Sequence, residues 1–135
     1  MQVGRRNKRN KYNILKKRKW QNHFLFFYLI RNGGIWMEEV IYEVQREQLK
    51  VILPKEVDHC NAMEIRKEVD KYIYGGKVVS VEFDFTNTNF MDSSGIGMIM
   101  GRHKLVKPLG GKIYLRGVSG NVERIIQVSG LYRLL

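Results

Sequence analysis

The chain has 135 residues, a 44% hydrophobic share and a formal net charge of +11, which suits one globular domain with one core. Its single cysteine, Cys60, excludes an intramolecular disulfide and a cysteine-rich metal cluster, and it fits a reducing, cytoplasmic setting. The charge is uneven: residues 1–36 hold ten of the 24 Lys and Arg and none of the 13 acidic residues. Residues 37–135 are therefore nearly neutral, and the high charge belongs to a leader.

The leader differs from the rest of the chain in composition. Residues 5–19 form a basic, Asn-rich run, and residues 24–30 form an apolar run. That run is too short to cross a membrane, which takes about twenty residues, and no small-residue cleavage site of a signal peptide follows it. One interpretation is a basic arm that binds nucleic acid or a membrane surface through residues 5–19.

The preferred interpretation is that Met37 is the true start. Codons for Gly33 and Gly34 can spell a GGAGG ribosome-binding sequence, and the codons of Ile35 and Trp36 give a typical bacterial spacing before the ATG of Met37. We therefore expect residues 1–36 to be a disordered leader or an upstream mis-start that packs poorly on the body, and residues 37–135 to be the domain.

Two strands are predicted at the start of the body. Apolar and polar residues alternate over Glu39–Arg46, and Gln48–Leu53 gives a second strand that pairs with the first as a hairpin. Pro54 ends the second strand because it has no backbone donor.

A helix and a buried strand are predicted next. Asn61 and Glu64 resemble a capping box, and Gly75-Gly76 gives a typical helix end. The apolar residues between them recur at helical spacing: Ala62, Ile65, Val69, Tyr72 and Ile73. The stretch from Val78 to Phe85 then predicts a buried strand, and we expect Val79, Val81 and Phe83 or their alternates to form the central strand.

The last third of the chain predicts two more helices and two more strands. One helix begins at Asp92 or Ser93 and ends near Lys107, a strand covers Lys112–Arg116, and Ser119 caps a helix that ends at Gly130. We expect Tyr132–Leu135 to begin a final strand. The order β-β-α-β-α-β-α-β favours an α/β fold with a mixed or mostly parallel sheet.

The segment Phe90–Gly97 places a pair of serines at a helix start. Helix N-termini present unpaired N–H groups and partial positive charge, so they stabilise a phosphate. A phosphate on such a serine would change a partner-facing surface in charge and bulk. Asp, Ser and Gly are also ordinary N-cap residues, so the tetrapeptide Asp92–Gly95 alone does not establish a function.

Other chemical patterns are weak. The spacing of Gly95, Gly97 and Gly101 misses the dinucleotide-binding pattern by one position, and we expect Gly97 and Gly101 to mark a close helix contact instead. The three histidines, His23, His59 and His103, lack metal-ligand spacing, and no catalytic set is evident. The sequence therefore indicates neither an enzyme nor a bound cofactor.

The motifs together resemble one family. Residues 90–104 read FMDSSGIG followed by GRHK, close to the FMDSSGLG and GRYK of bacterial anti-sigma factor antagonists of the STAS-domain family, in particular those of endospore formers. Glu56–His59, Gly110-Gly111, Val118-Ser119 and Ser129–Leu131 also match the family's pattern. The resemblance covers about residues 38–135. It departs from the pattern at Lys55, where many members have Gly, at His103, and at Leu135, beyond which members usually continue.

The resemblance implies a STAS fold, a mixed sheet with helices on one side, and a regulatory binding protein in the cytoplasm. In this family the unphosphorylated protein binds an anti-sigma factor that is also a serine kinase, which releases a sigma factor, sigma F in sporulation. The kinase then phosphorylates the serine that corresponds to Ser93, and a serine phosphatase reverses the modification. No cofactor, nucleic acid or membrane is implied for this chain. A general-stress antagonist or another STAS regulator is the alternative.

The resemblance also implies where the partner binds. The expected partner-binding residues are Asp58, His59, Met91, Asp92, Ser93, Ser94, Gly95 and Ile96.

The start-site hypothesis predicts the N-terminus of the native protein. Peptide mapping by mass spectrometry should recover residues from Met37 onward only, because translation would begin there. Abundant peptides from residues 10–30 would contradict the hypothesis.

Overall fold

The computed structural model describes residues 24–27, 30–31, 35–36 and 40–135. Its main sheet has five strands in the order β1-β4-β5-β7-β9, with β1 at Phe24–Phe27 and β4 at Val40–Gln45. The others are β5 at Gln48–Ile52, β7 at Ser80–Asp84 and β9 at Ile113–Arg116. β1, β4 and β5 pair antiparallel, whereas β5, β7 and β9 pair parallel, so the sheet is mixed.

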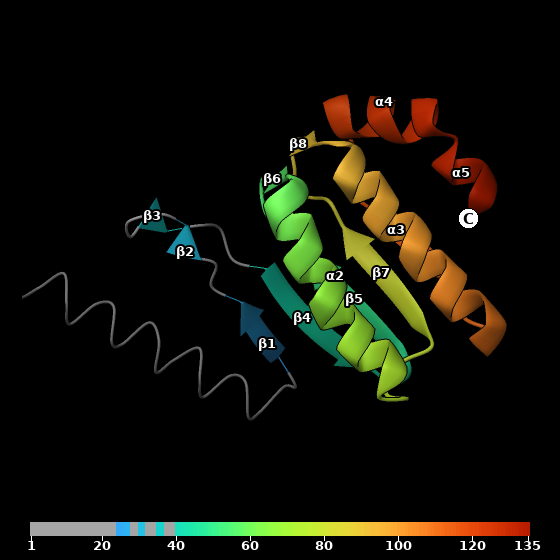
Figure 1. Ribbon diagram of the computed structural model, residues 1–135. Coiled ribbons are helices and arrows are strands. Elements are labelled where there is room, and N and C mark those ends of the chain that lie inside the picture. Colours follow the sequence, from blue (N-terminus) through green and yellow to red (C-terminus); the bar gives the residue numbers. More distant parts are fainter. Residues whose placement is uncertain (1–23, 28–29, 32–34, 37–39) are drawn as a thin grey trace, which may run out of the picture.

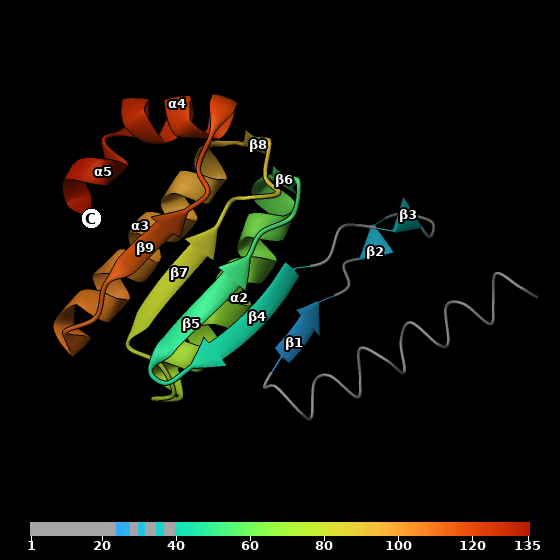
Figure 2. The same ribbon diagram turned by 180° about the vertical axis from the view of Figure 1, so that it is seen from behind.

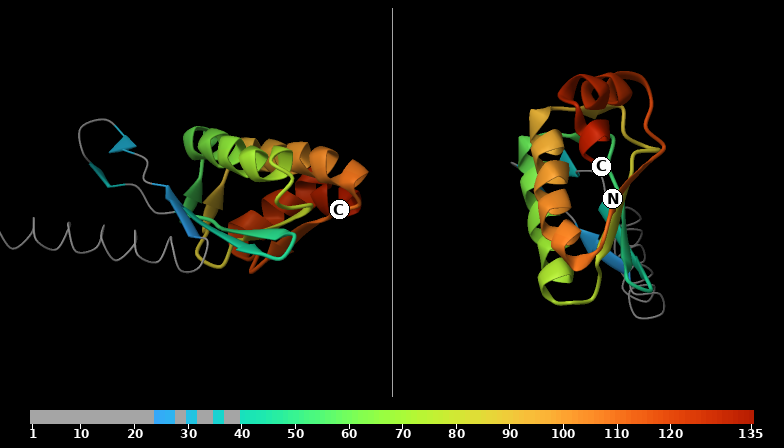
Figure 3. Two further views of the ribbon diagram at one scale, coloured as in Figure 1. Left: turned by 90° about the horizontal axis from the view of Figure 1, so that it is seen from below. Right: turned by 90° about the vertical axis from the view of Figure 1, so that its right-hand side faces the viewer.

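Two long helices cover one face of this sheet. They are α2, His59–Tyr74, and α3, Ser93–Val106, which lie side by side (Figure 1). Seen from behind, the other face of the sheet carries no helix formed by the described residues (Figure 2). The view from below shows the helices as a separate layer (Figure 3). Each helix is the crossover between two parallel strands, since α2 joins β5 to β7 and α3 joins β7 to β9.

Shorter elements complete the chain. The 3-10 turn η1, Lys107–Leu109, follows α3, and α4, Gly120–Ser129, packs against α3 and β8 near the start of α3 (Figure 1). α5, Leu131–Leu134, follows α4 directly. Two short strands, β6 at Glu56–Val57 and β8 at Phe90–Met91, pair with each other outside the main sheet.

The core lies between the sheet and the helices. Most strand residues that face the helices are buried because alternate side chains of a strand point to one face. Several core side chains share zero to one per cent exposure: Tyr42, Leu49, Val51, Val81, Phe83 and Phe85 from the sheet side, and Ile65, Val69 and Ile99 from the helices. Val81 and Phe83 thus confirm the buried strand, while Val79 lies before it and is partly buried. This strand, β7, lies inside the sheet between β5 and β9, but the central strand of the five is β5.

The predicted fold class is confirmed, whereas a predicted strand and a predicted helix cap are wrong. Tyr132–Leu135 is not strand: Gly130 takes a left-handed turn (φ 75), Leu131 is buried, and helical bonds continue to Leu135. The cap of α2 is Asp58 and not Asn61, because the Asn61 side chain is buried and donates to the Glu56 carbonyl at 2.6 Å.

Part of the leader contacts the body. β1 pairs with β4 from Phe24 opposite Glu43 to Phe27 opposite Val40, and Ile30–Arg31 (β2) pairs with Ile35–Trp36 (β3). The expectation that residues 1–36 pack poorly on the body does not hold at β1, where an apolar tetrapeptide extends the sheet by one strand. The basic run 5–19 lies outside the described residues.

The close helix contact expected at Gly97 and Gly101 is wrong. A Cβ at either position would have no described heavy atom within 4 Å outside its own helix neighbourhood. Close approaches lie at other glycines, among them Gly95 and Gly111. A Cβ on Gly95 would collide with the Met91 side chain, and one on Gly111 would collide with the carbonyl of Val79. A side-chain end can move, whereas the Val79 backbone is held in the sheet region.

These contacts predict opposite effects of two alanine substitutions. Gly111→Ala should lower the free energy of unfolding by about 1–3 kcal/mol, because backbone must shift to admit the methyl group. Gly97→Ala should raise it by up to about 1 kcal/mol, because alanine favours helix more than glycine does. Urea denaturation of both variants checks the pair, and equal effects would contradict the contact analysis.

Candidate functional site

The parallel pairing of β6 with β8 brings two helix starts together. Glu56 lies opposite Phe90 and Val57 opposite Met91, and the Asp92 amide donates to the Val57 carbonyl at 3.2 Å. Each short strand is followed directly by the N-cap of a long helix. The starts of α2 and α3 therefore lie at the same level, above the same edge of the molecule (Figure 1).

Both N-caps are aspartates in extended backbone. The Asp58 carboxylate accepts from the amides of Cys60 and Asn61, each at 3.0 Å, and the Asp92 carboxylate accepts from the Ser94 amide at 2.8 Å. A carboxylate at this position also interacts favourably with the positive end of the helix dipole. Each aspartate thus stabilises the start of the helix that it caps, Asp58 for α2 and Asp92 for α3.

A side-chain contact joins the two helix starts. His59 Nδ1 lies 3.3 Å from Ser94 Oγ, although the residues are 35 positions apart in sequence. His59 is exposed and Ser94 is half-buried. The contact brings the Asp58-His59 segment beside the serine pair, two features that are distant in the sequence.

The predicted site residues divide by exposure. Ser93 is exposed in the first turn of α3, and Asp58, Asp92 and Ser94 are half-buried. Three residues named as partner-binding, Met91, Gly95 and Ile96, are buried beneath them. Because Met91 fills the space beside the Gly95 backbone, these three support the surface from below and offer little of themselves to a partner.

A groove runs from the helix starts along the seam between α2 and α3. Its volume is about 420 Å³. It is lined by His59, Ala62, Met63 and Arg66 from α2 and by Ser94, Gly97, Met98, Gly101 and Arg102 from α3. Among the described residues that line it, none is acidic. Gly97 and Gly101 leave space between the two helices. They do not mediate the close helix contact that was expected from the sequence.

The sequence analysis missed Met63 and Arg66 as members of this surface. Their signal is the helical spacing i, i+3, i+4: His59, Met63 and Arg66 share one face of α2, as Ser94, Gly97 and Gly101 share one face of α3. The signal becomes readable only when the facing helix is known, since many faces of a helix show such spacing.

Arg102 closes the floor of the groove. It is 5% exposed, its Nε lies 2.9 Å from Asp70 Oδ1, and its Nη1 donates to the Met98 carbonyl at 3.3 Å. Burial lowers the pKa of Arg102, and the Asp70 carboxylate opposes that shift, so the guanidinium stays charged at neutral pH. This ion pair ties α3 to α2 along the seam.

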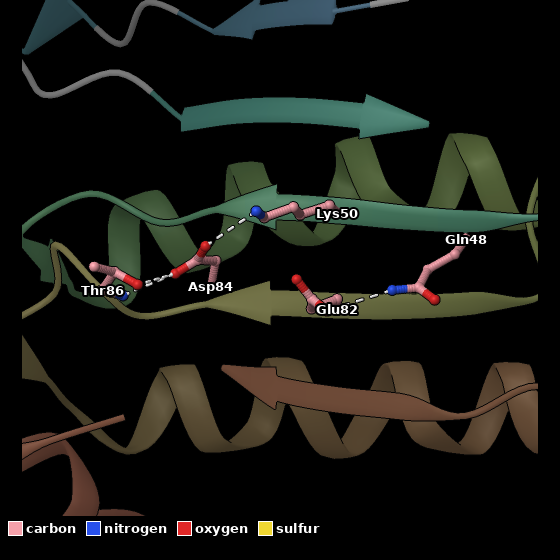
Figure 4. Close-up of polar contacts among 5 residues, drawn as sticks. All are labelled: Gln48, Lys50, Glu82, Asp84 and Thr86. Carbon is pink, nitrogen blue, oxygen red and sulfur yellow. Dashed lines mark hydrogen bonds and ion pairs between the residues drawn. The ribbon is translucent and has the colours of Figure 1, made fainter. Parts of the chain in front are cut away.

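A second polar network lies on the face of the sheet away from the helices (Figure 4). Lys50 Nζ lies 3.3 Å from Asp84 Oδ2, and Asp84 Oδ1 accepts from the Thr86 amide at 2.9 Å and hydroxyl at 2.6 Å. Burial would raise the pKa of Asp84, but the bonds from Thr86 and the charge of Lys50 outweigh it and lower that pKa. The network is satisfied and fixes the turn after β7.

The turn after β7 also holds β8 in position. The Thr88 hydroxyl donates to the Pro54 carbonyl at 2.7 Å, and the Asn89 amide donates to the Lys55 carbonyl at 2.8 Å. These bonds hold the loop before β8 against the segment before β6. They therefore stabilise the β6–β8 pairing that aligns the two helix starts.

Metal and membrane features are not found in the part of the chain that the structure describes. No group of three or more His, Cys, Asp or Glu residues there is placed to bind a metal ion. Among the same residues, no helix combines the length and apolar character that a bilayer crossing requires.

Comparison with known families and relatives agrees with this geometry. The family model described as STAS domain matches residues 39–135. An anti-sigma F factor antagonist of Paenibacillus polymyxa is 33% identical over 97 residues, 72% of this chain and 83% of the relative. That of Lysinibacillus sphaericus is 32% identical over 65% of this chain and 75% of the relative. An anti-sigma-B factor antagonist of Bacillus subtilis is 26% identical over 62% and 74%.

Solved structures show the same likeness. The anti-sigma factor antagonist SpoIIAA in its unphosphorylated form is 28% identical, with a TM-score of 0.64 over 82% of this chain and 84% of that chain. The Bacillus cell fate determinant SpoIIAA in the phosphorylated form is 27% identical, with a TM-score of 0.59 over 82% and 87%.

The ion pair in the groove floor yields a stability prediction. Asp70→Ala should lower the free energy of unfolding by about 2 kcal/mol, because it leaves the buried Arg102 guanidinium without its carboxylate. The matched control is Glu64→Ala, which removes an exposed pair with Lys67 on the same helix and should cost less than about 0.5 kcal/mol. Equal losses in thermal or urea unfolding would contradict the role given to Asp70.

Proposed function

This chain belongs to the STAS-domain family, and from that premise we propose that it is an anti-sigma factor antagonist, a regulatory binding protein and not an enzyme. The single observation that carries the proposal is the exposed Ser93 in the first turn of α3, set beside the start of α2. Relatives that share about a third of their residues with this chain bear that name, as does SpoIIAA.

The proposed partner of the unphosphorylated protein is an anti-sigma factor with serine kinase activity, and its capture releases the sigma factor. We assign the contact surface to Asp58, His59, Asp92, Ser93 and Ser94 and to the adjoining groove. The groove carries basic groups and thioethers, among them Met63, which is 45% exposed. This combination suits a partner segment with acidic and apolar side chains.

Phosphorylation of Ser93 is the proposed off-switch. The kinase moves the γ-phosphoryl group of its own ATP to Ser93 Oγ: a P–O bond to the serine forms, the bond to ADP breaks, and the serine proton leaves to the kinase or water. The product carries about −1.5 to −2 charges at neutral pH. The solved structure of SpoIIAA in the phosphorylated form supports this step. A serine phosphatase would restore the hydroxyl.

The position of Ser93 in the first turn of α3 explains why inactivation would not require the protein to unfold. The first-turn amides and the dipole of α3 stabilise an anion locally, by about 0.3–1 kcal/mol. Asp92 and Asp58 oppose it, because both carboxylates lie at the same pair of helix starts. A neutral hydroxyl at the partner contact is thus replaced by a bulky dianion on an unchanged fold.

Sigma F is the proposed pathway, and the general-stress pathway is the second candidate. Identity to the two anti-sigma F factor antagonists is 33% and 32%, against 26% to the anti-sigma-B factor antagonist of Bacillus subtilis. We also infer that residues 37–135 are the working domain and act in the cytoplasm without binding nucleic acid or membrane. The family match from residue 39 supports that boundary.

Three serine variants test the switch. Ser93→Asp should weaken binding to the anti-sigma kinase at least about tenfold, equivalent to about 1.4 kcal/mol, with a nearly unchanged melting temperature. Ser93→Ala should bind but accept no phosphate, and Ser94→Ala should remain a substrate at Ser93. A pull-down with mass spectrometry identifies the kinase, calorimetry gives affinities, and site mapping after incubation with ATP locates the phosphate.

Two results would count against the proposal. Unaltered affinity of Ser93→Asp would contradict the charge mechanism. Phosphate on Ser94 with Ser93 unmodified would overturn the assignment of the acceptor.

A further inference from the structure

We propose that His59 determines which of the two adjacent serines accepts the phosphate, by holding the Ser94 hydroxyl and leaving that of Ser93 available. The inference deepens the proposed function and rests on it. It assigns a specificity-determining role to a side chain on α2 for a modification on α3.

The two hydroxyls have the same intrinsic chemistry. Consecutive Cα atoms are about 3.8 Å apart, so a kinase that admits this helix start brings both serines near its active site. Selection between them must therefore come from their surroundings. The residue type does not distinguish them, because both are serines of the same Asp-Ser-Ser-Gly stretch.

The surroundings differ in the structure. Ser93 is exposed, and none of the described residues forms a hydrogen bond with its hydroxyl. Ser94 is half-buried and lines the groove, its amide is bound to Asp92, and its Oγ lies 3.3 Å from His59 Nδ1. Turning the Ser94 hydroxyl toward a kinase requires breaking that contact.

His59 is well placed for this role. It is the first residue of α2, directly after the Asp58 cap, and the pairing of β6 with β8 sets α2 level with α3. An imidazole has only two side-chain torsions, so holding it in one position loses less entropy than holding a lysine or arginine. Its Nδ1 can donate to or accept from a hydroxyl, according to the tautomer.

The test compares the phosphate ratio of Ser94 to Ser93, which does not depend on the overall rate. Parent, His59→Ala, His59→Asn and Cys60→Ala proteins are incubated with ATP and the kinase captured by the parent protein. One net hydrogen bond changes an equilibrium about three- to tenfold, so His59→Ala should raise the ratio by that factor. His59→Asn should behave like the parent, because an amide group can occupy the position of Nδ1.

Cys60→Ala is the matched control, since Cys60 is exposed on the same turn. It should leave the ratio unchanged. In a Ser93→Ala background, adding His59→Ala should raise Ser94 phosphate by a similar factor.

The outcomes separate the two proposals. If His59→Ala takes phosphate at Ser93 with the parent's ratio, the role of His59 is overturned while the proposed function stands. If the parent is modified on Ser94 and His59→Ala reduces this, His59 activates Ser94 and the inference is wrong in sign. If neither serine of the parent accepts phosphate, the proposed function fails, and the inference fails with it.

A measurement without the kinase tests the contact itself. The ¹⁵N resonance of His59 Nδ1 should shift in Ser94→Ala and stay in place in Ser93→Ala. An unchanged resonance in Ser94→Ala would overturn the inference, because the ring would not be bound to that hydroxyl.

Discussion

The candidate site depends on one short parallel pairing, that of Glu56–Val57 with Phe90–Met91. An N-cap residue follows each strand directly, so the pairing aligns the starts of the two long helices. The first-turn amides of both helices, which have no partner within their own helix, therefore point toward the same edge. The main sheet alone would not do this, since its parallel strands leave the crossover loops free to differ in length. The loop bonds at Thr88 and Asn89 are therefore as important to the site as the serines.

The two cap carboxylates give this edge a mixed electrostatic character. Asp58 and Asp92 already use part of the favourable potential of the helix starts, by binding three first-turn amides between them. A phosphate on the neighbouring serine would still find amide donors, but it would also face two negative groups. These effects act in opposite directions within the fold, so on the proposed function the partner surface would be the place where the added charge matters.

Sequence periodicity predicted most elements because apolar residues that recur every 2 or 3.6 positions mark the buried face of a strand or helix. The buried core around Phe83 consists of such residues. It failed where tertiary contacts decide. The Asn61 pattern is a valid cap in isolation, but its side chain is taken by the Glu56 carbonyl, so Asp58 caps instead. The groove was not predictable either, because it depends on which faces of α2 and α3 lie opposite each other. In addition, the sequence does not distinguish a glycine that leaves a groove open from one that permits close helix contact.

The GRHK segment contributes both to the groove and to the contact between α2 and α3. Gly101 opens the groove, whereas the next residue, Arg102, turns inward and pairs with Asp70 across the seam. An ion pair removed from water in this way holds the two helices in one geometry, because separating them would leave a buried charge without a partner. In the proposed switch, a charge added at the helix starts would act on a fixed frame. Partner release would then follow from desolvation and repulsion at the surface, and it would not require the helices to move.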